Sequence, residues 1–300
     1  MMNLERCGWP ALACLLLSAH ANGADGADGI PRHSATLSMQ GDENDNQQWW
    51  GKLALPLGDH AWVQGSLGRS ELATSPASNT KMIGAAVGIA GQRLDATVDF
   101  VRRTGDNAFE QQDWAAALNW HGTRGGVGAD VFLRSASGES QRTGAGGALA
   151  PSVTTTVRDS VDAKGFGLHG DFDLTPRTNV FAGAMRYRYD FSANSTTTGT
   201  DTPLSSLLGT TGSLSGAWRD QAFIDRSYRV GARYRFERAA VNAQYFHDRS
   251  ANTGEGFNTT QLQAELLLGG RWLVSPTLGY SSGGDTSPTG YGGLSLGFIW

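Results

Sequence analysis

Apolar and polar residues alternate along most of the chain from about residue 34 onward. Over residues 166–174, the even positions are Phe, Leu, Gly, Phe and Leu, whereas the odd positions include His169, Asp171 and Asp173. A period of two places successive side chains on opposite faces of a β-strand. Each such segment is therefore predicted to be a strand with one apolar face and one polar face. The same alternation occurs at 94–100, 228–237 and 261–268.

The full pattern predicts an all-β protein of about fourteen strands, with twelve or sixteen as the alternatives. Short connectors, such as 57–60 and 269–270, alternate with long polar ones, such as 136–163 and 192–223. Short turns on one side and long loops on the other predict an up-and-down antiparallel arrangement within one domain, residues 34–300. The predicted strands are 34–41, 47–57, 60–69, 80–90, 92–103, 111–121, 125–135, 164–174, 177–191, 224–236, 239–249, 258–269, 271–281 and 290–300.

Aromatic residues on the apolar parity cluster at the two ends of the predicted strands, and small or aliphatic residues occupy the middle. Trp and Tyr favour the two interfaces between a bilayer and water. The placement therefore predicts two aromatic girdles and an apolar face that contacts lipid. The predicted girdle residues are Trp49, Trp114, Trp120, Tyr187, Tyr189, Tyr245, Trp272 and Tyr280.

Together, the even strand count, the alternation of short and long connectors and the apolar last strand resemble a bacterial outer-membrane β-barrel of the porin type. The resemblance is to an architecture over residues 34–300 and not to a family with its own motif. It implies a closed transmembrane barrel in the outer membrane, with short periplasmic turns and long extracellular loops. It also implies contact with outer-membrane lipids and lipopolysaccharide. The last strand resembles the signal that the barrel-assembly machinery recognises, through Leu294, Leu296, Phe298 and Trp300.

Residues 1–21 resemble a secretory signal peptide. A short apolar run follows Arg6, and small residues at Ala19 and Ala21 predict cleavage near Ala21. Residues 22–33, rich in Gly, Ala and Asp, are expected to be disordered. Both cysteines, Cys7 and Cys14, lie in the segment predicted to be removed, so disulfides are not expected in the mature chain. The net charge of −4 argues against a nucleic-acid partner.

Charged residues are concentrated on the polar parity, which faces the lumen if the apolar parity faces lipid. Fourteen strands would enclose a lumen with a backbone radius on the order of 14 Å, too wide for side chains to fill. We predict a basic wall beside acidic patches, a field that would select among small polar solutes. The predicted basic residues are Arg186, Arg188, Arg229, Arg233 and Arg235, and the predicted acidic residues are Asp95, Asp99, Asp171 and Asp173.

The favoured function is a porin-like channel for passive diffusion of small hydrophilic solutes, anions included. Two alternatives stay open: an export duct for a polysaccharide with periplasmic partners, and a surface barrel without transport, such as an adhesin or scaffold. The charges could equally form a ladder of salt bridges that stiffens the barrel. No catalytic site is expected, because neither His169 with Asp171 nor His247 with Asp248 has a serine at suitable spacing. No cofactor or metal is expected either, since the histidines are scattered.

Overall fold

The computed structural model describes residues 33–72, 78–106, 108–144, 153–198, 223–251, 253–283 and 286–300. The predicted signal peptide and all but the last residue of the predicted disordered segment lie outside the described residues. Within the described ranges the secondary structure is strand and turn, and no helix is long and apolar enough to cross a membrane.

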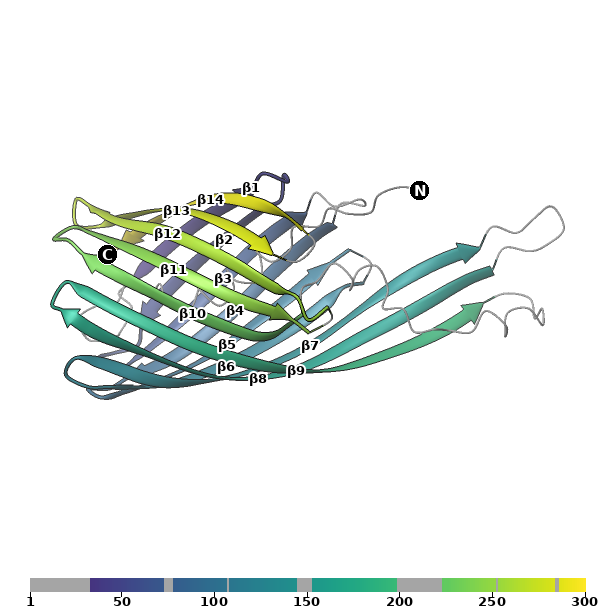
Figure 1. The fold of residues 1–300 in the computed structure, drawn as a ribbon, viewed down its shortest axis with the longest axis horizontal. Helices are drawn as coiled ribbons and strands as arrows, with labels where there is room; N and C mark the ends of the chain where they lie inside the picture. The colour runs from purple at the N-terminus through teal and green to yellow at the C-terminus, as the bar shows by residue number, and fades with distance from the viewer. Residues whose placement is uncertain are drawn as a thin grey trace.

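Fourteen antiparallel strands form one closed barrel, which confirms the predicted fold class and strand number (Figure 1). Each strand pairs with its neighbours in the sequence, and β1 pairs with β14 to close the cylinder. The strands are β1 Ser34–Asp42, β2 Gln47–Pro56, β3 Ala61–Leu72, β4 Ser78–Ala90, β5 Leu94–Gly105, β6 Glu110–His121, β7 Gly125–Gly144, β8 Val153–Thr175, β9 Thr178–Thr198, β10 Ile224–Arg235, β11 Ala239–Ser250, β12 Gly256–Leu268, β13 Trp272–Gly283 and β14 Thr286–Ile299.

The last residue of the chain belongs to the seam where the barrel closes. The backbone N–H of Trp300 donates a hydrogen bond to the carbonyl of His33 over 3.1 Å. The Trp300 ring also lies 5.9 Å from the His33 ring and 6.0 Å from the Phe298 ring. Closure matters physically, because a barrel without an edge leaves no row of unpaired backbone groups inside hydrocarbon.

The two faces of the wall are inverted relative to those of a soluble protein. Large apolar side chains are exposed on the outside, among them Ile83 at 63% and Leu278 at 65%, whereas Gln261 on the inner face is only 5% exposed. An exposed apolar belt around the whole cylinder requires a lipid surround. The predicted assembly-signal residues Leu294, Leu296, Phe298 and Trp300 share this outer face, and recognition by the assembly machinery remains a prediction.

Aromatic residues form a girdle at each end of the outer belt. In outer-membrane barrels the short turns face the periplasm, and we name the two ends accordingly. Trp120, Phe236, Trp272 and Trp300 lie on the outer face at the periplasmic end. The outer-face aromatics at the extracellular end are Trp49, Phe100, Trp114, Phe166, Tyr228, Tyr245 and Tyr280.

Three consecutive strands rise far beyond the rest of the extracellular rim. β7, β8 and β9 continue past the barrel as one paired sheet in Figure 1. The sequence pattern predicted strands of 125–135, 164–174 and 177–191 here, whereas the observed strands are Gly125–Gly144, Val153–Thr175 and Thr178–Thr198. The polar Ser, Thr and Arg residues of these segments do not alternate with apolar ones, so the periodicity ended before the strands did.

Candidate functional site

Strand parity decides which side chains reach the lumen. Asp95, Asp99, Asp171 and Asp173 share the inner face with the small and polar residues of β5 and β8. On β10, Arg229, Arg233 and Arg235 lie on the inner face, because the residues between them, including Val230, are exposed to the outside. These seven side chains therefore have the orientation that the sequence predicted, and their part in conduction remains a prediction.

The extracellular half of β9 has the opposite orientation from the one predicted. Arg186 pairs with the exposed, outward Phe166 of β8, so Arg186 and Arg188 lie on the outer face and not in the lumen. Tyr187 and Tyr189, assigned to the outer girdle by the sequence, lie on the inner face, and Tyr187 is only 6% exposed.

The physical reason is the unbroken pairing of β9. The β8–β9 register has no shift between the pairs Thr154↔Thr198 and Asp173↔Asn179. Val180 at the periplasmic end of β9 is on the lipid-facing parity, and a strand without a bulge keeps that parity along its whole length. Beyond the bilayer, the outer face meets water and headgroups, so arginine is at no disadvantage there.

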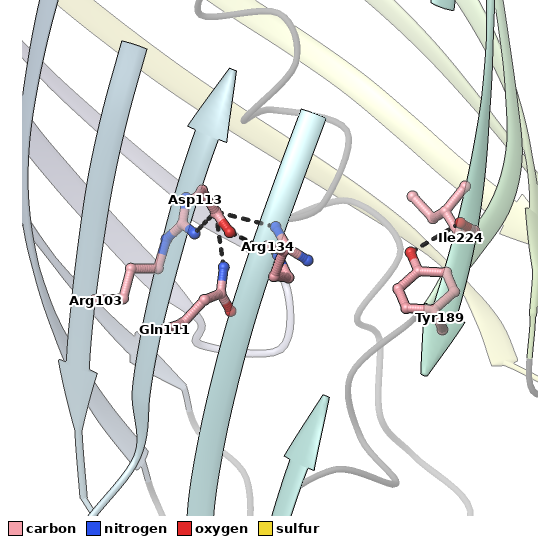
Figure 2. A network of polar contacts seen from close by, with 6 residues as sticks. All are labelled: Arg103, Gln111, Asp113, Arg134, Tyr189 and Ile224. Atoms are coloured by element: carbon pink, nitrogen blue, oxygen red, sulfur yellow. Dashed lines mark hydrogen bonds and ion pairs between the residues drawn. The ribbon is translucent and has the colours of Figure 1, made fainter. Parts of the chain in front are cut away.

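The inner face near the extracellular rim carries a buried ionic network that the sequence analysis missed (Figure 2). The Asp113 carboxylate accepts hydrogen bonds from Arg103, from Gln111 at 2.8 Å, and from Arg134 through Nε at 2.7 Å and Nη2 at 3.1 Å. The network joins β5, β6 and β7, and the Asp113 side chain is 9% exposed. Arg103 lies four residues after Asp99 and therefore on the same face of the strand as Asp95 and Asp99. This parity could have identified Arg103 as an inward residue from the sequence.

Next to this network, aromatic side chains run up the inner face of β9 towards the extracellular space. The Arg134 guanidinium lies 5.1 Å above the Phe132 ring, which meets the Tyr187 ring edge-on at 5.6 Å. Tyr187, Tyr189 and Phe191 follow at alternate positions, with ring centroids 6.4 and 5.9 Å apart. We call Phe132, Tyr187, Tyr189 and Phe191 the aromatic ladder.

Phe223, the residue before β10, covers the upper part of the aromatic ladder together with Ile224. Phe223 is 2% exposed and packs edge-on against Tyr189 at 5.3 Å and Phe191 at 5.2 Å. The Tyr189 hydroxyl donates a hydrogen bond of 2.9 Å to the carbonyl of Ile224. Tyr189 lies beyond the girdle residue Phe166 on the extracellular side, and burial raises its pKa to about 12.

Several inward aromatic rings lie against glycines of a neighbouring strand. A Cβ on Gly231 would collide with the Phe181 ring, and one on Gly88 would collide with the Trp62 ring. The rings therefore occupy the space that a side chain would fill and lie close to the wall. Above Phe181, the Arg229 guanidinium stacks at 5.7 Å from the ring centroid. Among the described residues no carboxylate forms an ion pair with Arg229, but Asp130 lies close enough to interact with it electrostatically.

Nearer the periplasm, histidines and carboxylates are bound to each other or to amides. His169 is hydrogen-bonded at both ring nitrogens, to Asp130 and to Asn119, each at 2.7 Å. His121 lies 2.6 Å from Asp95. With both ring nitrogens occupied, the His169 ring is held in one orientation.

The aspartates of β8 and the arginines of β10 do not form a direct ladder within the described part of the chain. The Asn179 amide of the intervening strand donates to Asp171 at 2.9 Å and to Asp173 at 3.0 Å. Arg233 instead pairs with Glu265 of β12 at 2.5 Å. The aspartates of β8 therefore stay separated from the arginines of β10, with the Asn179 amide between them.

The remaining strands have a mainly uncharged polar inner face, with Lys52, Asp248 and Glu265 among their charged side chains. The inner faces of β11 to β14, together with β1 and β2, carry mainly amides and hydroxyls that are buried against one another, such as Ser38 and Ser295 at 2.7 Å. Such groups both donate and accept hydrogen bonds. The glutamines of these inner faces are Gln40, Gln48, Gln244, Gln261 and Gln263. The described residues contain no cluster of three or more histidine or acidic side chains placed to hold a metal ion.

The closed barrel, the outward apolar belt and the two girdles are the architecture of bacterial outer-membrane β-barrel proteins, and this chain has that fold. No protein-family model matches the sequence, and no curated protein is significantly similar to it. Among solved structures, the chain is similar to the CymD monoaromatic hydrocarbon channel, with a TM-score of 0.60, 10% identity, and coverage of 90% of this chain and 88% of that one. It is also similar to a FadL homologue of Pseudomonas aeruginosa, with a TM-score of 0.59, 11% identity, and 94% of each chain covered. At these identities the similarity shows the fold alone.

Proposed function

We propose that this protein is an outer-membrane channel through which small hydrophilic solutes, anions in particular, diffuse passively. The observation that carries the proposal is the inner face of β10. Arg229 projects from it without an ion-pair partner among the described residues, and Arg235 is exposed at its periplasmic end. A cationic strand face beside amides and hydroxyls attracts an anion and replaces part of its hydration shell.

Ion selectivity in planar bilayers tests this function. Under a KCl gradient, the purified mature protein should give channel steps with a reversal potential on the chloride-selective side. Arg229→Glu combined with Arg233→Glu should move the reversal potential towards potassium, because two cations of the wall become anions. Lys81→Glu with Arg102→Glu is a matched control, since both residues lie on the outer face and should leave selectivity unchanged. Folded protein that gives no channel steps would rule out the simple pore.

The aromatic ladder and the rings that lie against glycines favour a second candidate, a channel for small aromatic solutes. A flat ring beside an arginine binds aromatic carboxylates through stacking and charge together. The CymD structure, which is similar in fold at 10% identity, is named as a monoaromatic hydrocarbon channel.

Flux into proteoliposomes separates the two candidates. Benzoate, acetate and arabinose give an aromatic anion, a small anion and a neutral sugar. Faster entry of benzoate than of acetate, lost on Phe181→Ala, would favour the aromatic candidate. Equal entry of both anions would favour the general anion channel. We assign no catalytic step to the lumen, because His169 is held by two hydrogen bonds.

A further inference from the structure

A row of arginines crosses the outer face of three neighbouring strands at the extracellular rim. Arg186 of β9 pairs directly with Arg226 of β10, and Arg226 pairs directly with Arg249 of β11. All three share the face of Phe166, which pairs with Arg186 and points outward. We call these three residues the arginine row.

Two further cations extend the same patch on the extracellular side. Lys164 of β8 pairs with Arg188 of β9, and both side chains are exposed on the outer face. Neither they nor Arg186 form an ion pair or a side-chain hydrogen bond with another described residue. Like charges placed directly opposite each other on a sheet destabilise it. The juxtaposition therefore needs a compensating anion or full hydration.

Acidic groups near the patch compensate only part of its charge. Arg226 contacts Asp225 at 3.2 Å, and Arg249 donates to the Gly254 carbonyl at 3.1 Å. Asp162 and Asp190 pair with each other one step further out on β8 and β9. Three carboxylates thus accompany five cations, and positive charge remains in excess.

The position of the row identifies the surface that it meets. Tyr228, two residues from Arg226 on the same face, belongs to the extracellular girdle, and its ring stacks on His247 at 6.3 Å. Two residues along a strand span roughly 7 Å. The arginine row therefore begins one side-chain step beyond the aromatic residues that mark the bilayer interface, at the depth of lipid headgroups.

Elsewhere on this rim the outward arginines that the structure describes have carboxylate partners. Arg102 is 2.9 Å from Glu110, and Arg69 is 2.8 Å from Glu71. The patch on β8 to β11 differs, because Lys164, Arg186 and Arg188 form no ion pair with another described residue and lie beside two further arginines on the same side of the barrel. Guanidinium groups bind phosphate oxygens through paired, charge-assisted hydrogen bonds.

We propose that the arginine row, flanked by Lys164 and Arg188, binds the phosphate groups of an outer-leaflet glycolipid headgroup. Phosphate oxygens inserted between the guanidinium groups remove their mutual repulsion. The lipid's acyl chains then lie against the apolar belt below, beside Phe166 and Tyr228. This site is separate from the lumen and does not depend on the proposed channel function.

Lipid binding to the purified mature barrel in neutral detergent tests the site. Native mass spectrometry would measure the affinity for bisphosphorylated lipid A and for its dephosphorylated form. We expect Arg186→Gln, Arg226→Gln and Arg249→Gln together to weaken binding of the phosphorylated lipid by about tenfold or more. The dephosphorylated lipid should bind both proteins equally.

A charge-matched control distinguishes a site from general attraction. Arg69→Gln, Lys81→Gln and Arg102→Gln remove the same charge from the outer face on the other side of the barrel, and should change affinity less than twofold. An equal loss in this control, or no loss in the row variant, would overturn the proposal. Displacement of the lipid by an equimolar amount of inorganic phosphate would show a free-phosphate site and would also overturn it. If the triple variant fails to fold, Arg186→Gln alone should still weaken lipid binding severalfold.

Discussion

Replacing Asp113 by asparagine should destabilise the barrel more than any single change in an exposed ion pair. The Asp113 side chain is 9% exposed, and its partners Arg103 and Arg134 are 11% and 21% exposed. The asparagine side chain would keep one acceptor oxygen but no charge, leaving two guanidinium groups in a confined space. Removing one partner of a buried ion pair costs about 3–5 kcal/mol. We expect a loss of that order in the free energy of unfolding.

Urea unfolding in phospholipid vesicles, followed by tryptophan fluorescence, measures this loss. Arg102→Gln is the control, because the exposed Arg102–Glu110 pair should contribute no more than about 1 kcal/mol. The combination Arg103→Met, Asp113→Leu and Arg134→Met should recover most of the stability, since it removes the uncompensated charge together with the pair. A loss for Asp113→Asn no larger than that for Arg102→Gln would refute the view that the network is buried and mutually dependent.

Three further outcomes follow from the described geometry. Gly231→Ala should destabilise the barrel by about 1–3 kcal/mol, because the new Cβ meets the Phe181 ring. Gly65→Ala is the control and should cost far less, since no atom lies within 4 Å of its new Cβ. Equal urea midpoints for the two variants would contradict this. Tyr189 should stay protonated at pH 11, where unfolded protein ionises its tyrosines near pH 10. Its contribution to stability is therefore full below pH 10 and declines as pH rises towards 12, and comparison with Tyr189→Phe by absorbance at 295 nm checks this. Trp300→Ser should slow insertion by purified assembly machinery severalfold but leave spontaneous refolding into thin bilayers unchanged. Equal slowing of both processes would show that Trp300 acts only in closing the barrel between β1 and β14.

Within the bilayer, periodicity was sufficient to predict the fold. Lipid on one side and polar groups on the other force strict alternation, so strands such as 166–174 could be assigned together with their orientation. Closure and strand number followed, because an open edge in hydrocarbon is unfavourable.

Outside the bilayer the same rule has no physical basis, and there the sequence analysis was wrong about orientation. Around Arg186 and Tyr187 both faces of β9 meet polar surroundings or protein, so hydrophobicity no longer distinguishes outside from inside. Only the continuous pairing with β8 fixes that choice. The contact between Phe181 and Gly231 could not be predicted from the sequence either, because it depends on the register between β9 and β10.

The long strands β7, β8 and β9 make the extracellular rim of the described barrel higher on one side than on the other. A strand the length of β8, Val153–Thr175, extends roughly 75 Å at about 3.3 Å per residue, whereas some ten residues suffice to cross the bilayer. Among the described residues, the extracellular rim is therefore high along β7 to β9 and low beside β12 and β13, which end near the girdle (Figure 1). For the proposed channel, a solute that arrives from the medium beside β12 and β13 would pass the least protein among the described strands, so the two sides of the rim would differ in access.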